Sequence, residues 1–115
     1  MANGTFQRFA AVIASGASTS AEVDMGRGFS KVMFDNTGGA GSTMFFVGGS
    51  SGGTFRQLKY PVLSGMSAPQ TITVGSATSG SLVEITQLQG FRYVKVATDA
   101  TVANGVTLYL YGADV

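Results

Sequence analysis

The sequence predicts an all-β protein, a single-domain antiparallel β-sandwich or jelly roll of about eight strands. Apolar and β-branched runs alternate with clusters of Gly, Ser, Asn and Asp, which is the pattern of short strands joined by turns. The chain has 115 residues, 17 of them glycine, and glycine supplies the positive φ that many tight turns need. No segment keeps a helical period, and the best helical candidate, Phe6–Ala14, contains the β-branched pair Val12 and Ile13, which argues for a strand as much as for a helix.

The breaks between apolar runs indicate where each expected strand begins and ends. Strands are expected near Thr5–Ala14, Ala21–Met25, Phe29–Asn36, Thr43–Val47, Phe55–Val62, Thr71–Val74, Leu82–Ile85, Phe91–Thr98 and Val106–Tyr111. The glycine-rich stretch Gly48–Gly53 lacks the Gly-Lys-Ser/Thr ending of a phosphate-binding loop, so it predicts a hairpin. Because Asn-Gly between apolar runs is a strong hairpin signal, Asp99–Gly105 predicts a hairpin that pairs the last two strands.

The chain shows no internal linker, so one domain is expected to cover all of it. Residues 1–13 form an N-terminal arm and the first strand, and residues 14–115 form the rest of the same sandwich. Ala2–Phe9 is expected to dock on a partner, since arms can become ordered on binding. No apolar run approaches the about 20 residues of a membrane-spanning helix, and the N-terminus lacks a signal-peptide layout.

The charge balance argues against a nucleic-acid partner. Only 11% of residues are charged, and the formal net charge is +1. Nucleic-acid-binding domains usually carry a basic patch or stripe, whereas the seven Lys and Arg residues here are scattered along the chain. Weakly charged surfaces repel neighbouring proteins poorly, so this composition favours a protein that works inside an assembly.

Catalytic and metal-binding groups are scarce. The sequence has neither His nor Cys, which removes Ser-His-Asp and Cys-His catalysis and zinc sites built from these ligands. Glu22 and Asp24 share a strand face and could hold calcium with backbone carbonyls, but solvated edge carboxylates are the preferred interpretation. Asp35 and Asn36, followed by Gly38-Gly39, predict a turn. We therefore expect no enzyme activity and no cofactor, and a hydrolase is the least supported alternative.

Two late strands have one aliphatic face and one aromatic face. The aliphatic positions are Val94 and Val96 in one strand and Val106, Leu108 and Leu110 in the other. The opposite positions are Phe91, Tyr93 and Lys95, and Thr107, Tyr109 and Tyr111. The aliphatic faces predict core. The aromatic faces predict either contacts with a partner or side chains that cap the edge of the core.

The order of several segments resembles a known group of proteins. These segments are a first strand followed by Ala14–Gly26, then Phe29–Phe34, Thr43–Leu58, Leu88–Val96 and Val106–Tyr111. From Ala14 to Gly112 the chain is similar to small bacteriophage virion proteins of the head-decoration, cement or head-fibre type. Gly90–Val96 also resembles the late strand of discoidin-like carbohydrate-binding sandwiches, in which that strand belongs to the scaffold.

This resemblance implies a non-enzymatic protein of the capsid surface, assembled in the host cytoplasm. Its expected partners are the major capsid protein or another virion protein and further copies of itself, with a trimer suggested by the three-fold positions of icosahedral lattices. The expected contact residues are Phe6, Phe9, Phe91, Tyr93, Tyr109 and Tyr111. The alternative is a fibre, spike or tail module that binds a host-surface glycan or receptor through its tyrosines.

Overall fold

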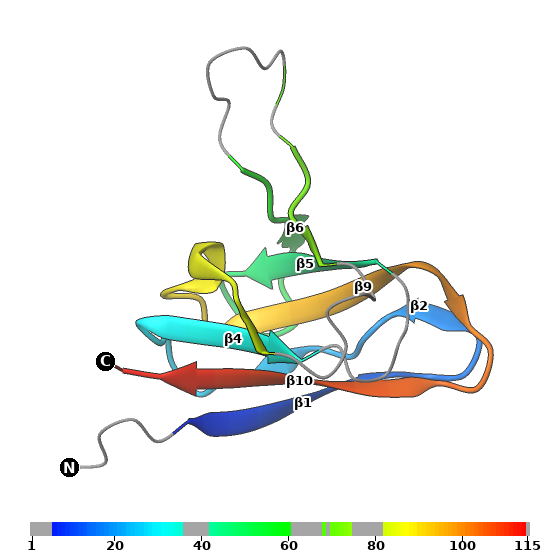
Figure 1. Ribbon diagram of the computed structural model, residues 1–115, viewed down its shortest axis with the longest axis horizontal. Coiled ribbons are helices and arrows are strands. Elements are labelled where there is room, and N and C mark those ends of the chain that lie inside the picture. Colours follow the sequence, from blue (N-terminus) through cyan, green and yellow to red (C-terminus); the bar gives the residue numbers. More distant parts are fainter. Residues whose placement is uncertain (1–5, 36–41, 61–67, 69, 75–81, 115) are drawn as a thin grey trace.

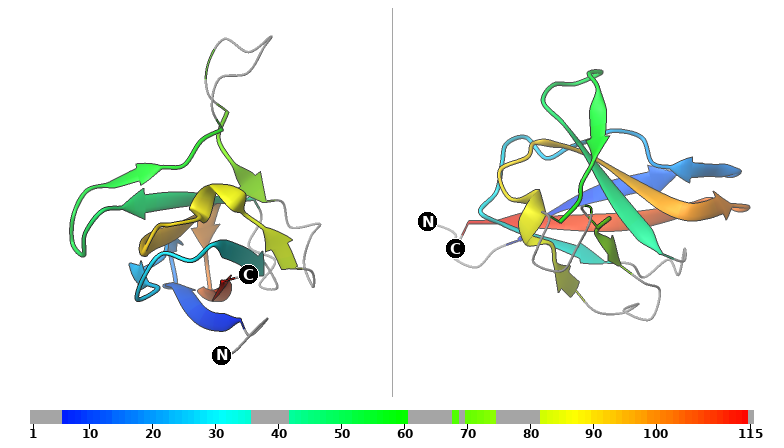
Figure 2. Two further views of the ribbon diagram at one scale, coloured as in Figure 1. Left: turned by 90° about the vertical axis from the view of Figure 1, so that its left-hand side faces the viewer. Right: turned by 90° about the horizontal axis from the view of Figure 1, so that it is seen from above.

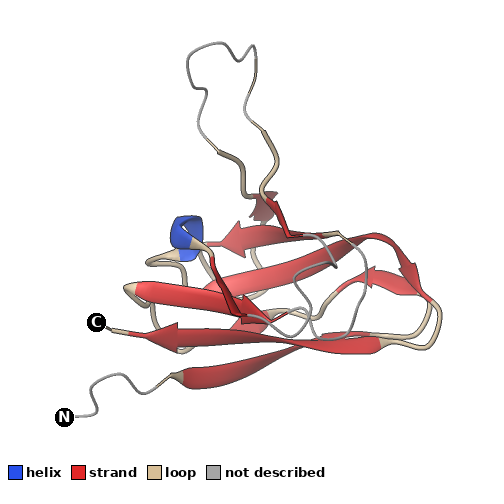
Figure 3. Ribbon diagram, viewed as in Figure 1, coloured by secondary structure: helices blue, strands red, loops and turns tan. Residues whose placement is uncertain are grey.

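The computed structural model describes residues 6–35, 42–60, 68, 70–74 and 82–114, and in this part the regular secondary structure consists almost wholly of strands (Figure 3). The strands are β1 (Gln7–Ile13), β2 (Ala17–Thr19), β3 (Val23–Asp24), β4 (Lys31–Asp35), β5 (Thr43–Gly48), β6 (Phe55–Gln57), β7 (Thr73–Val74), β8 (Leu82–Glu84), β9 (Tyr93–Val102) and β10 (Val106–Ala113). A single 3₁₀ turn, η2 (Thr86–Leu88), precedes β9 in this part of the chain. The all-β prediction is confirmed.

The strands form two antiparallel sheets that pack face to face (Figures 1 and 2). Sheet A has the order β1-β10-β4-β8, and sheet B has the order β2-β9-β5-β6, with β3 added on β9 and β7 on β5. This arrangement is a β-sandwich, in which the inward side chains of both sheets build one core.

The core consists of the side chains that alternate inward along the strands. The buried positions from sheet A are Ala11, Ile13, Val32, Phe34, Leu108 and Leu110, and those from sheet B are Val23, Phe45, Val74, Val94 and Val96. Phe34 and Phe45 meet between the sheets edge to face, with ring centroids 5.0 Å apart and planes at 88°. Edge-to-face geometry is favourable for aromatic rings, so this pair stabilises the contact between the two layers.

The predicted hairpin between the last two strands is wrong, because β9 and β10 lie in different sheets. β9 pairs with β2, β3 and β5, whereas β10 pairs with β1 and β4. The Asn-Gly sequence does make a tight turn, in which the Gly105 N–H donates to Val102 O. That turn carries the chain from sheet B to sheet A instead of folding it back within one sheet.

A second turn lies beside it, between β1 and β2, and carries the chain from sheet A to sheet B. The Ala17 N–H donates to Ala14 O, and the Ser15 hydroxyl donates to Ala103 O at 2.5 Å, which ties the two turns together. Gly16 and Gly105 have φ values of 79° and 73°, which residues with a Cβ rarely adopt. The two turns therefore form one corner of the sandwich.

One antiparallel ribbon runs through this corner without a change of register. The paired residues are Gln7 with Gly112, Ile13 with Val106, and Ala17 with Val102. From the first pair to the last, each residue further along the N-terminal strand is paired with one residue earlier in the C-terminal strand. The β1–β10 and β2–β9 ladders are thus two halves of one bent ribbon, and the register shifts only beyond Ala17.

Other expected elements differ in length from those observed. The Gly48–Gly53 hairpin is confirmed, since β5 and β6 pair antiparallel on either side of it. The strand expected over Phe55–Val62 is shorter, because β6 ends at Gln57 and residues 61–62 lie outside the described part. Sequence patterning did not predict β2, whose three residues are small and include the polar Ser18 and Thr19.

Beyond β6 the chain leaves the sandwich as a projecting stem (Figure 1). The Tyr60 N–H donates to Gln70 O at 2.8 Å, and Lys59 forms a bridge with Thr71. Below this stem, Leu58 packs against the core and Ile72 is buried in it. The stem is therefore anchored in sheet B at its base.

A substitution at Gly112, near the end of β10, tests how tightly this strand packs against Phe29. A Cβ on this residue would lie 2.5 Å from the ring of Phe29, a buried side chain. We expect Gly112→Ala to lower the free energy of unfolding by about 1 to 3 kcal/mol, because the ring must shift within the core. Chemical denaturation measures this change.

Gly49→Ala is the matched control, since a Cβ at Gly49 meets no atom within 4 Å. Its free energy of unfolding should stay within about 0.5 kcal/mol of the parent value. Equal effects of the two substitutions would contradict the packing described for Phe29.

Candidate interaction surface

The outer face of sheet A presents a regular grid of side chains. Strand register places them in two rows across β1, β10, β4 and β8. One row is Ala10, Tyr109, Asp35 and Leu82, and the next is Arg8, Tyr111, Met33 and Glu84. Val12 and Thr107 extend the grid by one further pair. We call these ten residues the sheet A face.

The sheet A face leaves large apolar side chains in contact with solvent. Val12 is 51% exposed and Leu82 is 45% exposed, and Tyr60 is the other large hydrophobic residue exposed to this degree within the described residues. Met33, Tyr109 and Tyr111 are half-buried along the middle of the face. The Arg8 guanidinium lies 4.7 Å from the ring centroid of Tyr109. The face therefore combines apolar area with Arg8 and Glu84 on its two edge strands and Asp35 on the inner strand β4.

The outer face of sheet B also carries aromatic side chains, but its own polar groups cover them. Lys95 Nζ lies 4.6 Å from the ring centroid of Phe55, and that ring rests on Gly48, whose Cβ position would be 3.0 Å from it. The Arg92 guanidinium lies 4.9 Å from the ring of Tyr93. Of the two predictions for the aromatic side chains, contact with a partner or capping of the core edge, those on this side therefore fit the second better.

The structure separates the aromatic residues that sequence patterning grouped as partner contacts. Tyr109 and Tyr111 lie on the sheet A face, whereas Tyr93 lies on the outer face of sheet B. Phe91, half-buried, precedes β9 on the sheet B side, where its N–H donates to Leu88 O at 3.3 Å. One partner surface cannot include both sets.

The remaining two expected contacts lie at the start of the described chain. Phe9 points inward, packs against the core and lies 5.9 Å from the ring of Phe29. Phe6 is half-buried directly before β1. Residues 2–5 of the expected docking segment lie outside the described part of the chain.

Among the residues of the sheet A face that sequence patterning missed are its three other large apolar side chains, Val12, Met33 and Leu82. A usable signal existed for Met33, because it alternates with the core residues Val32 and Phe34 in β4. Val12 also alternates with two core residues, Ala11 and Ile13. Leu82 carries no such signal, because β8 is only three residues long.

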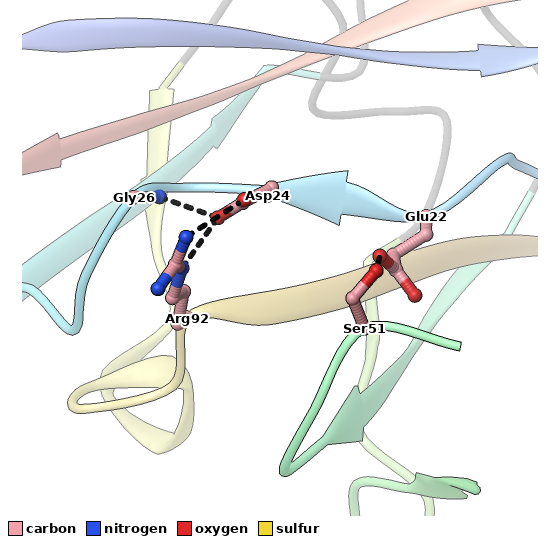
Figure 4. Close-up of polar contacts among 5 residues, drawn as sticks. All are labelled: Glu22, Asp24, Gly26, Ser51 and Arg92. Atoms are coloured by element: carbon pink, nitrogen blue, oxygen red, sulfur yellow. Dashed lines mark hydrogen bonds and ion pairs between the residues drawn. The ribbon is translucent and has the colours of Figure 1, made fainter. Parts of the chain in front are cut away.

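Glu22 and Asp24 each fasten a loop instead of forming a joint site (Figure 4). The Ser51 hydroxyl donates to Glu22 Oε2 at 2.6 Å, and the Gly52 N–H donates to Glu22 Oε1 at 2.8 Å. Asp24 accepts two hydrogen bonds from Arg92, at 2.7 and 3.1 Å, and one from the Gly26 N–H at 2.8 Å. Glu22 therefore holds the β5–β6 turn, and Asp24 holds the approach to β9.

These hydrogen bonds favour the charged form of both carboxyls. The Ser51 hydroxyl, followed by the Gly52 N–H, lowers the pKa of Glu22 below its ordinary value. The Arg92 side chain, followed by the Gly26 N–H, lowers the pKa of Asp24. The described residues contain no group of three or more acidic side chains that could hold a metal ion.

Asp35, predicted to start a turn, lies at the end of β4 between Tyr109 and Leu82 in the sheet A grid. Its Oδ1 is buried and makes no hydrogen bond within the described part of the chain. The glycines of the predicted turn, at positions 38 and 39, lie outside that part.

Comparison with known proteins gives no relatives. No family model, no curated protein and no solved structure matches this chain significantly. Within the described residues, no helix has the length and apolar character needed to cross a membrane.

The Glu22 contacts predict a pH-dependent stability. Because folding lowers the pKa of Glu22, its contribution is present above the ordinary value of 4.5 and is lost as pH falls through the folded-state pKa. We expect Glu22→Gln to lower the Tm at neutral pH and the difference from the parent to shrink below pH 4.5. Thermal unfolding monitored by circular dichroism across this range measures it.

Ser51→Ala serves as the matched variant, because it removes the first of the two donors to Glu22. Combined with Glu22→Gln it should cost less than the two separate effects added together, since both remove the same contact. A Tm difference that does not change with pH would contradict this assignment.

Proposed function

We propose that this chain is a non-enzymatic structural protein of the bacteriophage virion surface, a decoration or cement protein that binds the major capsid protein. The observation that carries the proposal is the sheet A face, where Val12 and Leu82 stand exposed beside half-buried Met33, Tyr109 and Tyr111. The resemblance of the sequence to small virion proteins supports the choice of the capsid as partner.

The composition of the sheet A face suits contact with another protein. Tyr, Met and Arg are enriched where proteins meet, and each is present here at Tyr109, Tyr111, Met33 and Arg8. Burying their apolar area releases about 25 cal/mol per Å², so a seam between capsid subunits covered by this face would be stabilised. A rigid sheet also presents its contacts with little loss of conformational freedom.

The hydrogen bonds of Glu22 and Asp24, the two carboxylates considered as a possible site, support a non-enzymatic role. Glu22 and Asp24 point to different partners, Glu22 to Ser51 and Gly52 and Asp24 to Arg92 and Gly26. The paired carboxylates of glycoside hydrolases face each other across the space that the substrate occupies. This pair serves to hold loops in place.

The alternative is a fibre, spike or tail module that binds a host-surface glycan or receptor. It is favoured by Tyr109, whose ring is flanked in the grid by Asp35 on β4. The Arg8 guanidinium lies over the Tyr109 ring, so Arg8 and Asp35 would bind the hydroxyls of a sugar that contacts the edge of this ring. Glycan-array binding without capsid binding would select this alternative.

The test is co-sedimentation of the purified protein with heads that lack it. We expect saturable binding at a fixed ratio to the capsid protein and a higher temperature of head disruption. Leu82→Asp should weaken binding by about 10-fold or more, because it places a charge within the buried contact.

Thr73→Asp is the matched control, since Thr73 is likewise exposed on a short strand but belongs to sheet B. It should bind heads like the parent protein. If neither the parent nor any variant sediments with heads, the capsid proposal is wrong. If Thr73→Asp weakens binding as much as Leu82→Asp does, the sheet A face is not the contact.

A further inference from the structure

β1 is an edge strand of unusual length for this molecule. It ends sheet A and spans seven residues, whereas the other strands at sheet margins, β2, β3, β6, β7 and β8, have two or three residues each. Very short edge strands are one way in which proteins prevent unwanted strand pairing. The described part of the chain uses this protection at every sheet margin except β1.

The backbone of β1 offers hydrogen-bonding groups on its open side. Val12 O accepts from the Ala21 N–H at 3.1 Å, so Val12 directs its backbone groups away from β10. In an antiparallel ladder, alternate residues point their N–H and C=O groups to the same side. Arg8 and Ala10 therefore also direct theirs outward, where no other strand of the described residues pairs with β1.

Charge does not protect this edge. Arg8 is the one charged residue of β1, and the strand contains no proline. The Arg8 guanidinium lies over the ring of Tyr109 on the neighbouring strand, 4.7 Å from its centroid. The charge is thus drawn back over its own sheet and away from the open edge.

Phe9 adds a second, independent observation. Its side chain points inward and packs against the core, yet it remains only half-buried. The ring of Phe29 packs against it at a tilt of 53°, with centroids 5.9 Å apart. An inward aromatic residue on an edge strand gains full burial when another strand is added beside it.

We propose that two copies of this chain dimerise through their β1 edges, with the two strands antiparallel about a two-fold axis at Phe9. In this register Arg8 of each copy lies opposite Ala10 of the other, and each such pair exchanges two backbone hydrogen bonds. The two Phe9 rings meet across the axis and cover each other. The four strands of sheet A from each copy form one continuous sheet.

Two features of β1 select this register over its neighbours. An axis at Arg8 would pair Ala10 with Phe6, which precedes the first residue of β1, so fewer ladder hydrogen bonds would form. An axis at Ala10 would place Val12, whose carbonyl is already occupied by the Ala21 N–H, inside the new ladder opposite Arg8, whereas an axis at Phe9 leaves it opposite Phe6, which precedes β1. The partner is a second copy of the chain because β1 is complementary to itself in this register, with Arg8 paired to Ala10 and Phe9 to Phe9. A two-fold pair closes at two molecules, in place of the trimer expected from the sequence.

The first test is sedimentation velocity of the purified full-length protein from about 10 µM to about 1 mM, a range suited to a small interface. We expect a monomer–dimer equilibrium. Over the same range, hydrogen exchange at the Arg8 and Ala10 amides should slow as concentration rises, while exchange at amides in the middle of β9 stays unchanged.

Substitutions at Ala10 test the register. Ala10→Pro removes an outward N–H from each copy and leaves the bonds to β10 intact, so the dissociation constant should rise about 30-fold. Ala10→Lys, placed opposite Arg8 of the second copy, should raise it several-fold, and Ala10→Glu should lower it by a similar factor. Thr73→Lys and Thr73→Glu, on sheet B, are the controls and should leave it unchanged.

The proposal fails if the parent protein is monomeric at every concentration, if it forms a trimer, or if Lys and Glu at position 10 act alike. These measurements use the protein alone, so they are independent of the capsid experiment. Loss of head binding by Leu82→Asp with the dimer intact would separate the two surfaces.

Discussion

The edge-to-face contact between Phe34 and Phe45 joins the two sheets inside the core, and it determines which side of each strand faces inward. Once Phe34 of β4 points inward, register makes Leu110 and Phe9 inward as well, across β10 and β1. Phe45 does the same for sheet B through Val96 on β9. Every intervening side chain must then point outward, because the side-chain period of a strand is two. The sheet A face follows from this rule.

The corner at Gly16 and Gly105 explains how so short a chain closes a sandwich. One ribbon bends there from sheet A into sheet B, so that β1–β10 and β2–β9 share a register and a single set of ladder contacts. The remaining strands add to this ribbon on either side. β1 stays at the open margin of sheet A, since its ribbon partner β10 already pairs with β4 on its other side.

Much of the secondary structure could be predicted from the sequence because it depends on neighbouring residues. Alternation identified Leu108 and Leu110 as core and placed Tyr109 and Tyr111 opposite them, and burial bears this out. The glycine-rich turn after β5 was identified for the same local reason. The candidate surface was found only in part. Tyr109 and Tyr111 were named, but Met33 and Leu82 belong to distant segments, and no local pattern brings them to the same face.

By itself the sequence determined that the protein is all-β, where most strands lie, and which side of the long strands is apolar. These properties depend on side-chain period and on turn residues, both of which act over a few positions. Tertiary structure alone decided which strands become neighbours. The sequence Asn104-Gly105 specifies a tight turn equally well in a hairpin and at a corner between sheets. The pairing of β10 with β1, about a hundred residues earlier in the chain, selects the corner. That pairing places Tyr93 and Tyr109 on opposite sides of the molecule, because burial of the shared apolar core requires the two sheets to face each other.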